Sequence, residues 1–467
     1  MTTTIVSIGG VTSAGGTTAL DTGAVATLVT NSAPTFVVTW SKTLASTIDV
    51  GDIAKATDSG STTYEYLITA ISGTQYTLIQ KVGGGLNQDP ATICAVVDEY
   101  GDCSTIASFS FYRAFSTITL FEAMIDDASP IYWGGSDDVV GECHKDSVFT
   151  DSRVYFDNKQ SLASVKLTVN SDDRHDGTAG SGVIIRPTAG SGHNNGIIDV
   201  DIDNFIMEWI EIDLSSLDAQ NTNKAVLLRG TNDDNIIRNN IIHDKGGNPG
   251  NTGPFAIHVL AAGATSDNLY ILNNIIYSFI ETSSDSTAAI LAVLWQGGLY
   301  IYNNTIYKFT SQGSKFAIGI RFGNDTDNVS YIKNNIVAGL SNGPRAYWKN
   351  AAGSTANVAN NLSDDTTGAT YNAEDMAQSL NDSSALIGKT AAQIDFVNTV
   401  GGSEDLHLNT ASVCREAGVD LGTTNEVNID IDGVDRAIVA ETWDIGADQA
   451  SAKGGSAGKA FIMFLDT

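Results

Sequence analysis

Basic residues, proline and cysteine are all scarce in this chain of 467 residues. It has 7 prolines and 4 cysteines, and its 25 lysines and arginines are outnumbered by 54 aspartates and glutamates, which gives a formal net charge of −29. Such a surface repels phosphate groups, so we expect no direct binding to DNA or RNA. We interpret most of the excess acid as a solvated surface.

Long apolar runs are also missing, as is a secretory signal. No stretch approaches the ~18 apolar residues of a membrane-spanning helix. The opening residues, MTTTIVSIGGVTSAGG, have neither a basic region nor an apolar region of the signal-peptide kind. We therefore expect neither a signal peptide nor a membrane partner.

The four cysteines, Cys94, Cys103, Cys143 and Cys414, are too few and too scattered for a disulfide scaffold. Cys94 and Cys103 can bridge a hairpin, but we expect two buried thiols instead.

Paired asparagines recur through the middle of the chain. The pairs start at Asn239, Asn273, Asn303, Asn334 and Asn360, at intervals of 26 to 34 residues. An alternating apolar strand precedes most pairs, a second strand follows, and a third apolar run comes later in each unit, as in NLYILNNIIYSF and then AAILAVLW. Three short strands in ~30 residues fit one coil of a parallel β-helix whose coils stack at ~4.8 Å. The sequence predicts an all-β fold, a right-handed single-stranded parallel β-helix.

The asparagines suit this architecture for two reasons. Asparagine tolerates the left-handed conformation that a tight corner needs, and an inward amide can bond the asparagine of the next coil in a ladder. The sequence does not say which member of each pair does which. The ladder candidates are the second members, Asn240, Asn274, Asn304, Asn335 and Asn361.

The rest of the chain divides around these coils. We expect an antiparallel docking module in 1–100, a leading segment with a capping helix (116–128) in 101–150, coils in 151–370, further coils and a cap in 371–450, and a linker with an apolar tail in 451–467. The first coil strands are expected at 164–169, 182–187, 196–202 and 205–212. The tail AFIMFLDT either packs on its own domain or docks into a neighbour.

Several motifs resemble a known family. The run from GDCSTIASFSFYRAF to VGECHKDSVF, and the later EDLHLNTAS, IDIDGVDR and WDIGADQ, resemble the opening and closing segments of bacterial and phage β-helix proteins of the pectate-lyase-like superfamily. The resemblance covers roughly residues 100–450. Val413 and Cys414 stand where relatives usually have proline and an acid. The resemblance implies the architecture more than the function, because the superfamily includes lyases, hydrolases, adhesins and virion spikes.

Three aspartates are the candidate metal ligands. Asp199, Asp201 and Asp203 alternate in DVDID, which would put three carboxylates on one side of a strand, and calcium accepts such ligands. The same alternation fits a plain acidic face. No other cofactor is expected, and IDIDG is interpreted as a structural turn.

The candidate catalytic acids are Glu208, Glu211 and Asp213. Glu208 stands next to Trp209, and an aromatic wall can raise a carboxyl pKa and stack on a sugar. Trp209 and Trp295 are the candidate sugar-binding aromatics. A buried tryptophan beside a surface glutamate is the competing interpretation. No complete lyase or hydrolase motif is present.

Three functions fit these observations. The favoured one is a structural phage virion protein, a spike, fibre or capsid decoration that contacts host glycans and sits on the virion or an extracellular surface. The resemblance then implies a homo-oligomer, with a trimer favoured, joined to other virion proteins through 1–100 or 460–467. The alternatives are a polysaccharide lyase or glycoside hydrolase with its groove along the β-helix, and a non-catalytic glycan-binding adhesin.

Overall fold

The computed structural model describes residues 3–9, 19–82, 89–97, 103–127, 136–192, 194–217, 224–229, 234–246, 254–260, 268–281, 286–293, 295, 297–311, 316–323, 329–349, 355–365, 384–439 and 442–450. The linker and apolar tail expected in 451–467 lie outside these ranges.

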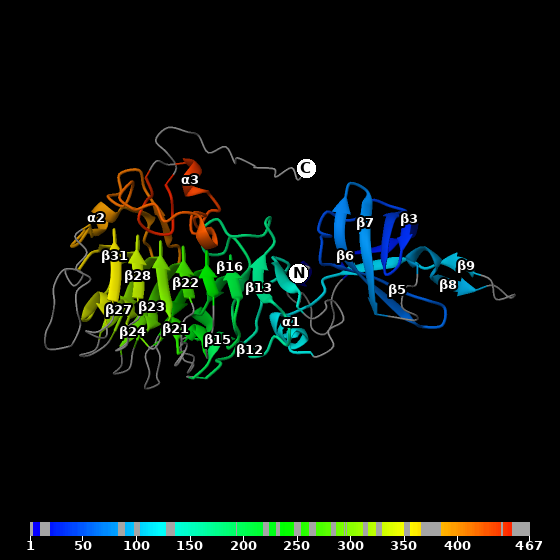
Figure 1. Cartoon of the computed structure of the whole chain (residues 1–467), viewed down its shortest axis with the longest axis horizontal. Helices are drawn as coiled ribbons and strands as arrows, with labels where there is room; N and C mark the ends of the chain where they lie inside the picture. The colour runs from blue at the N-terminus through cyan, green and yellow to red at the C-terminus, as the bar shows by residue number, and fades with distance from the viewer. Residues whose placement is uncertain are drawn as a thin grey trace.

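Three parallel sheets confirm the predicted β-helix (Figure 1). Sheet I runs β1 (Thr3–Gly9), β11 (Asp138–His144), β13 (Ser164–Val169), β16 (Phe205–Glu208), β19 (Asn235–Arg238), β22 (Asn268–Leu272), β25 (Gly298–Tyr302), β28 (Val329–Lys333), β31 (Thr355–Ala359). Sheet II runs β12 (Val154–Phe156), β15 (Gly196–Val200), β18 (Lys224–Leu228), β21 (Phe255–Val259), β24 (Thr287–Ala292), β27 (Ala317–Phe322), β30 (Pro344–Lys349). Sheet III runs β14 (Ile184–Ile185), β17 (Glu211–Asp213), β20 (Ile241–Lys245), β23 (Ile275–Ile280), β26 (Thr305–Thr310), β29 (Ile336–Ala338), β32 (Leu362–Ser363).

Aliphatic columns fill the space between the sheets. Ile271 pairs with Ile301, which pairs with Ile332, so one isoleucine lies above the next through three coils, and all three are fully buried. Phe279 and Phe309 stack inside sheet III with ring centroids 4.8 Å apart. Each buried isoleucine or phenylalanine contributes about 1.5–3 kcal/mol through burial.

The two asparagines of each pair have different roles. The first members adopt the left-handed conformation at the corner between sheets I and III, with φ values of 53, 54, 55, 56 and 56° in Asn239, Asn273, Asn303, Asn334 and Asn360. The second members form the ladder: the Nδ2 of each donates to the Oδ1 of the next at 3.0 Å, from Asn240 through Asn274, Asn304 and Asn335 to Asn361.

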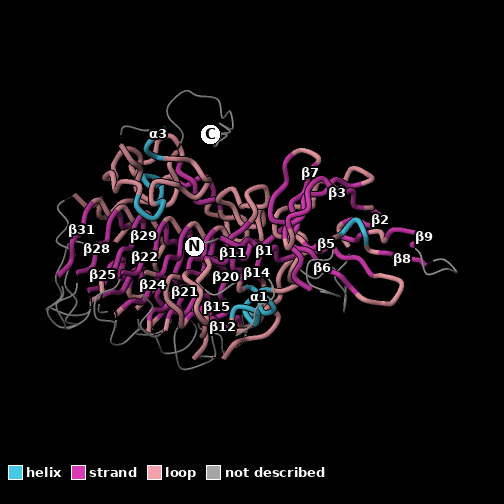
Figure 2. Tube along the Cα trace, turned by 45° about the vertical axis from the view of Figure 1, so that its right-hand side comes forward, coloured by secondary structure: helices cyan, strands magenta, loops and turns pink. Residues whose placement is uncertain are grey.

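The C-terminal part of the chain lies along the coils. It contains α2 (Ala391–Ile394), β33 (Phe396–Asn398), β34 (Asp405–Leu408), η3 (Thr424–Glu426) and α3 (Arg436–Val439), and Figure 2 shows it above the row of coils. Outward isoleucines of sheet III, such as Ile275 and Ile336, pack in one cluster with Leu406, Ile431 and Ile445. The described part of 384–450 therefore covers sheet III, where the sequence suggested further coils and a cap.

The first asparagines also hold this segment. Asn273 Nδ2 donates to the carbonyl of Ile429 at 2.8 Å. Asn334 Nδ2 donates to the carbonyl of Val419 at 2.8 Å, and the Val419 amide donates back to Asn334 Oδ1 at 2.9 Å. A corner residue whose amide faces outward thus satisfies backbone groups of a segment far away in sequence.

A seven-stranded antiparallel sheet forms the N-terminal module, as the sequence predicted (Figure 1). Its order is β2 (Asp21–Ala24), β10 (Phe109–Tyr112), β5 (Ile53–Thr57), β6 (Thr63–Ser72), β7 (Gln75–Val82), β4 (Thr35–Trp40), β3 (Ala26–Ser32). Two strands cross the expected boundary at residue 100: β10 belongs to the module, whereas β1 pairs in parallel with β11 of the β-helix. Arg113 joins the two parts, since it bonds Asp52 at 3.0 Å and Asp146 at 2.8 Å.

The helix α1 (Ile118–Ile125) lies where the capping helix was expected. It begins after Thr117, whose side chain accepts from the Leu120 amide, and it buries Phe121 against Phe115 and Phe156. No helix among the described residues is long and apolar enough to cross a membrane.

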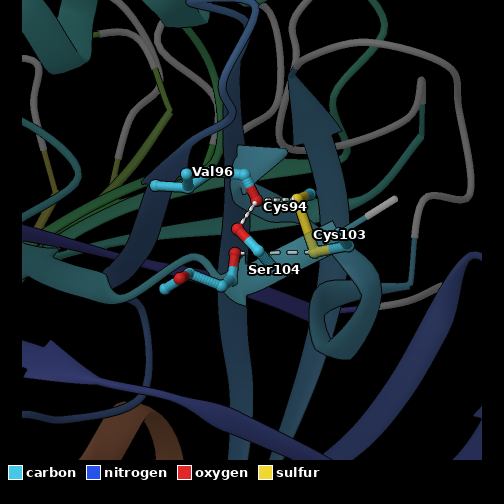
Figure 3. The surroundings of a disulfide bond; sticks show 5 residues. Cys94, Val96, Cys103 and Ser104 are labelled. Carbon is cyan, nitrogen blue, oxygen red and sulfur yellow. Dashed lines mark hydrogen bonds between the residues drawn. A yellow bond between two sulfur atoms is a disulfide. The ribbon is translucent and has the colours of Figure 1, made fainter. Parts of the chain in front are cut away.

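The expectation of two buried thiols at Cys94 and Cys103 is wrong. The two residues form a disulfide across the hairpin of β8 (Cys94–Val97) and β9 (Cys103–Ile106), after η1 (Pro90–Thr92), and Ser104 Oγ donates to the Val96 carbonyl beside it (Figure 3). Antiparallel pairing brings the two Cα atoms to 5.5 Å, within disulfide range. Cys143 and Cys414 are buried free thiols.

Replacement of Asn304 tests the division of roles between the asparagines. Asn304→Ala leaves buried partners in two coils unpaired and should cost about 3 kcal/mol of unfolding free energy. Asn303→Gly keeps the left-handed corner and should cost about 1 kcal/mol. Urea unfolding followed by tryptophan fluorescence measures both. Equal losses in the two variants would contradict the assignment.

Candidate functional site

The aspartates of DVDID do not gather at one point. Asp199 is fully buried on β15 and is bound by Arg153 Nη2 at 2.8 Å and Arg229 Nε at 2.6 Å. Asp201 and Asp203 lie beyond the end of β15, where the chain turns toward β16. Strand alternation therefore stops before it can align them, and no possible metal-ligand group among the described residues includes any of the three.

Glu208 is buried, and two basic side chains and one hydroxyl contact its carboxylate. Its carboxylate contacts Lys166 Nζ at 2.6 Å, Arg238 Nε at 2.7 Å and Thr168 Oγ1 at 2.7 Å. Burial raises the pKa of this carboxyl, but the charges of Arg238 and Lys166 and the hydrogen bonds from Lys166 and Thr168 outweigh it and lower the pKa to about 2. A carboxyl that stays ionised at ordinary pH fits cohesion between strands better than general acid catalysis.

Neither candidate tryptophan offers an open face to a sugar. Trp209 is buried at the corner with φ 63°, with Arg174 4.7 Å above its ring and His175 beside it. Trp295 is buried, and its Nε1 donates to the Gly298 carbonyl at 3.1 Å.

Glu211 and Asp213 do come together with His243 on sheet III. His243 lies between two carboxylates: its Nε2 is 3.0 Å from Glu211 Oε1 and its Nδ1 is 3.0 Å from Asp244 Oδ2. Asp213 pairs in register with His243 in the neighbouring strand. The ligand atoms of Glu211, Asp213 and His243 all lie within 4.8 Å of one another.

The carboxylates of this cluster already have basic partners. Arg186 Nε contacts Asp213 at 2.6 Å. Burial lowers the pKa of His243, but hydrogen bonds to Asp244 and Glu211 outweigh it and raise the pKa to about 9. The imidazole is therefore charged at neutral pH and forms ion pairs with Glu211 and Asp244. We call this cluster the sheet III ion-pair network.

A groove of about 280 Å³ opens next to the network. Its lining comes from the start of the short helix η2 (Ser215–Leu217), from the ends of β20, β23 and β26, and from the loop before β34. The lining residues are Ser215, Asp244, Gly246, Ser278, Ile280, Lys308, Thr310, Gly402 and Glu404. Glu404 Oε1 accepts from Ser278 Oγ at 3.0 Å and from Lys308 Nζ at 3.2 Å. The C-terminal segment thus completes a polar site on sheet III.

The groove follows a row of left-handed residues. Asp244, Ser278, Lys308 and Gly339 have φ values of 59, 59, 60 and 70° and lie in successive coils, each five positions after the first asparagine of its pair. Non-glycine residues in this conformation carry strain, which clusters at functional sites. The constant offset was present in the sequence, but aspartate, serine, lysine and glycine share no chemistry that would have revealed it.

The closing motif holds a second buried network. Asp430 accepts backbone amides from Asp432 at 3.0 Å and Val434 at 2.7 Å, which forms the turn expected at IDIDG. Arg436 is fully buried and donates to the carbonyls of Gly446 and Ala447 at 2.9 and 2.7 Å. These contacts close the chain on itself and leave the groove at Glu404 as the best candidate site.

His243 gives the site a measurable pH dependence. Its folded pKa of about 9 lies above the usual 6.5, so its stabilisation is complete below pH 6.5 and is lost as the pH rises through 9. His243→Gln should therefore be less stable than the wild type by up to about 3 kcal/mol at pH 6, with the difference shrinking toward pH 10. Urea unfolding across this range measures it. A difference that does not change with pH would refute the charged imidazole.

No protein-family model, no curated protein and no solved structure matches the chain.

Proposed function

We propose that the chain is a structural protein of a phage virion, a spike, fibre or capsid decoration built on the β-helix. The observation that carries the proposal is the use of its buried acids. Asp199, Glu208 and Asp213 are each paired with arginine or lysine from neighbouring segments. Acids held this way join coils together, which is what a stiff rod requires.

The attachment of the N-terminal module supports the same role. β1 extends sheet I, so the chain enters the β-helix before it forms the module. The buried Arg113 then bonds Asp52 of the module and Asp146 of the β-helix. A module fixed at two points can transmit the orientation of the rod to whatever it binds. We propose that it docks to other virion proteins and that 460–467 provides a second contact.

The sequence resemblance supports the proposed location, ligand and assembly. The closing motif, WDIGADQ, is similar to that of phage and bacterial β-helix proteins of the pectate-lyase-like superfamily. We propose a location on the virion or an extracellular surface, contact with host glycans, and a homotrimer, because three prisms can bury their flat faces together. Calcium is left out of the proposal, since two arginines already occupy Asp199.

The mass in solution tests the assembly. Light scattering on the purified chain should give three times the mass of one chain, unchanged on dilution through the micromolar range. A clean monomer would contradict the proposed homotrimer and weaken the virion assignment.

A second function is favoured by the groove on sheet III. Asp244, Lys308 and Glu404 place two acids and a base around one opening, as a polysaccharide lyase or glycoside hydrolase requires. Against it, Lys308 and Glu404 are paired with each other. The third alternative, a glycan-binding adhesin, requires that the chain binds a glycan without cleaving it.

Turnover assays separate these functions. The structural proposal predicts no new reducing ends and no unsaturated products from a panel of acidic and neutral polysaccharides. Turnover that Glu404→Gln abolishes, and that Glu416→Gln on the surface leaves intact, would overturn the structural proposal in favour of the enzyme.

A further inference from the structure

The charges that line the groove on sheet III are already paired. Among the described lining residues, Asp244 and Glu404 are acids and Lys308 is a base. Glu404 Oε1 lies 3.2 Å from Lys308 Nζ, and Asp244 Oδ2 lies 3.0 Å from Nδ1 of the charged His243. These pairs offset each other, so the groove favours a ligand without a net charge. The net charge of −29 on the whole chain adds a repulsion of anions.

Glu404 holds other lining groups in place. Its side chain is 1% exposed, and its Oε1 accepts from Ser278 Oγ at 3.0 Å as well as from Lys308 Nζ at 3.2 Å. Its Oε2 accepts from the Gly402 amide at 2.7 Å. A buried carboxylate with these donors fixes their positions before any ligand arrives, so less entropy is lost when a ligand binds.

The lining offers both hydrogen-bond donors and acceptors. Ser278 gives its proton to Glu404, so its oxygen can accept one from a ligand. Lys308 has an ammonium group with several protons and a side chain that is 42% exposed, so it can donate to a ligand while it pairs with Glu404. Asp244 bonds His243 through Oδ2, and its Oδ1 can accept. A sugar hydroxyl donates and accepts at the same time and therefore suits this mixture.

The dimensions of the groove suit a sugar ring. Asp244, Ser278 and Lys308 occupy the same position in successive coils, and coils stack at ~4.8 Å, which is close to the span of one sugar ring. Side chains of neighbouring coils can therefore bond opposite edges of the same ring. The groove volume of about 280 Å³ lies just below the roughly 300–1,000 Å³ of most small-molecule sites, which leaves room for one or two rings.

Aliphatic side chains stand beside the polar ones. Ile280 lines the groove and is 41% exposed, and it pairs in register with Thr310, another lining residue. Val400 begins the turn that contains Gly402 and is 65% exposed. A sugar ring has a C–H face that packs on aliphatic side chains while its hydroxyls bond polar groups. Small-molecule sites commonly combine apolar contact with a few placed polar groups in this way.

We propose that the groove on sheet III binds a neutral sugar, one or two uncharged hexose units of a longer glycan. Lys308 donates to a sugar hydroxyl, Ser278 and Asp244 accept from hydroxyls, and Ile280 packs on the C–H face of the ring. The proposal rests on the proposed function in taking a glycan as the contacted ligand, and it adds the site and the class of glycan. It requires no cleavage.

Calorimetry on the full chain tests the site with maltohexaose, cellohexaose and mannohexaose as neutral probes and hexagalacturonate as an anionic one. At least one neutral probe should bind, with an affinity that changes less than about twofold as salt rises from about 50 to about 500 mM, and hexagalacturonate should not bind. Lys308→Met and Ile280→Ala should each weaken binding about tenfold. Ile438→Ala, at an isoleucine of α3 that is 67% exposed and does not line the groove, should change it by less than about twofold.

The proposal is overturned if no neutral probe binds, if Ile438→Ala loses as much affinity as Ile280→Ala, or if affinity falls steeply with salt. Because Ile280 is exposed, its replacement leaves the core intact, and lost binding in that variant reports on the site. Light scattering on the same samples separates this inference from the assembly proposal. A trimer that binds no neutral probe upholds the assembly and overturns the inference, whereas a monomer that binds through the groove does the reverse.

Discussion

The stacked amides of the asparagine ladder set the register on which the structure depends. An asparagine that accepts from the backbone amide and the side-chain amide of the coil before it, as Asn304 Oδ1 does for Asn274, fits only one alignment of two coils. A slip by one residue would bury the wrong face of every strand and leave these amides unpaired. The aliphatic columns supply most of the burial energy, but they are alike from coil to coil and would tolerate a slip better.

The other asparagine of each pair connects the coils to the end of the chain. Because it turns the corner in the left-handed conformation, its amide faces out of the solenoid and bonds carbonyls near Val419 and Ile429. The C-terminal segment then covers the outward isoleucines of sheet III and brings Glu404 to Lys308. The groove is consequently a product of chain closure.

Much of the fold was predictable from the sequence, and much of the candidate site was not. The asparagine pairs predicted the period, the corner and the strands on both sides, because every coil needs the same corner and the same residues therefore recur in the sequence. The Cys94–Cys103 bond was misjudged because spacing alone does not show that two strands are paired. Glu208 looked like a catalytic acid because its cations, Lys166 and Arg238, come from adjacent coils and are 42 and 30 residues away. Lys308 and Glu404 meet only after the chain folds back.

Hydrogen exchange measured by mass spectrometry tests most directly whether the coils and the C-terminal segment form one unit. Peptides that cover Asn303–Asn304 and peptides from 404–436 should exchange at the same slow rate, through one shared opening of the whole β-helix. The contradictory result is a C-terminal segment that exchanges orders of magnitude faster than the coils, because the outward asparagines would then not hold it.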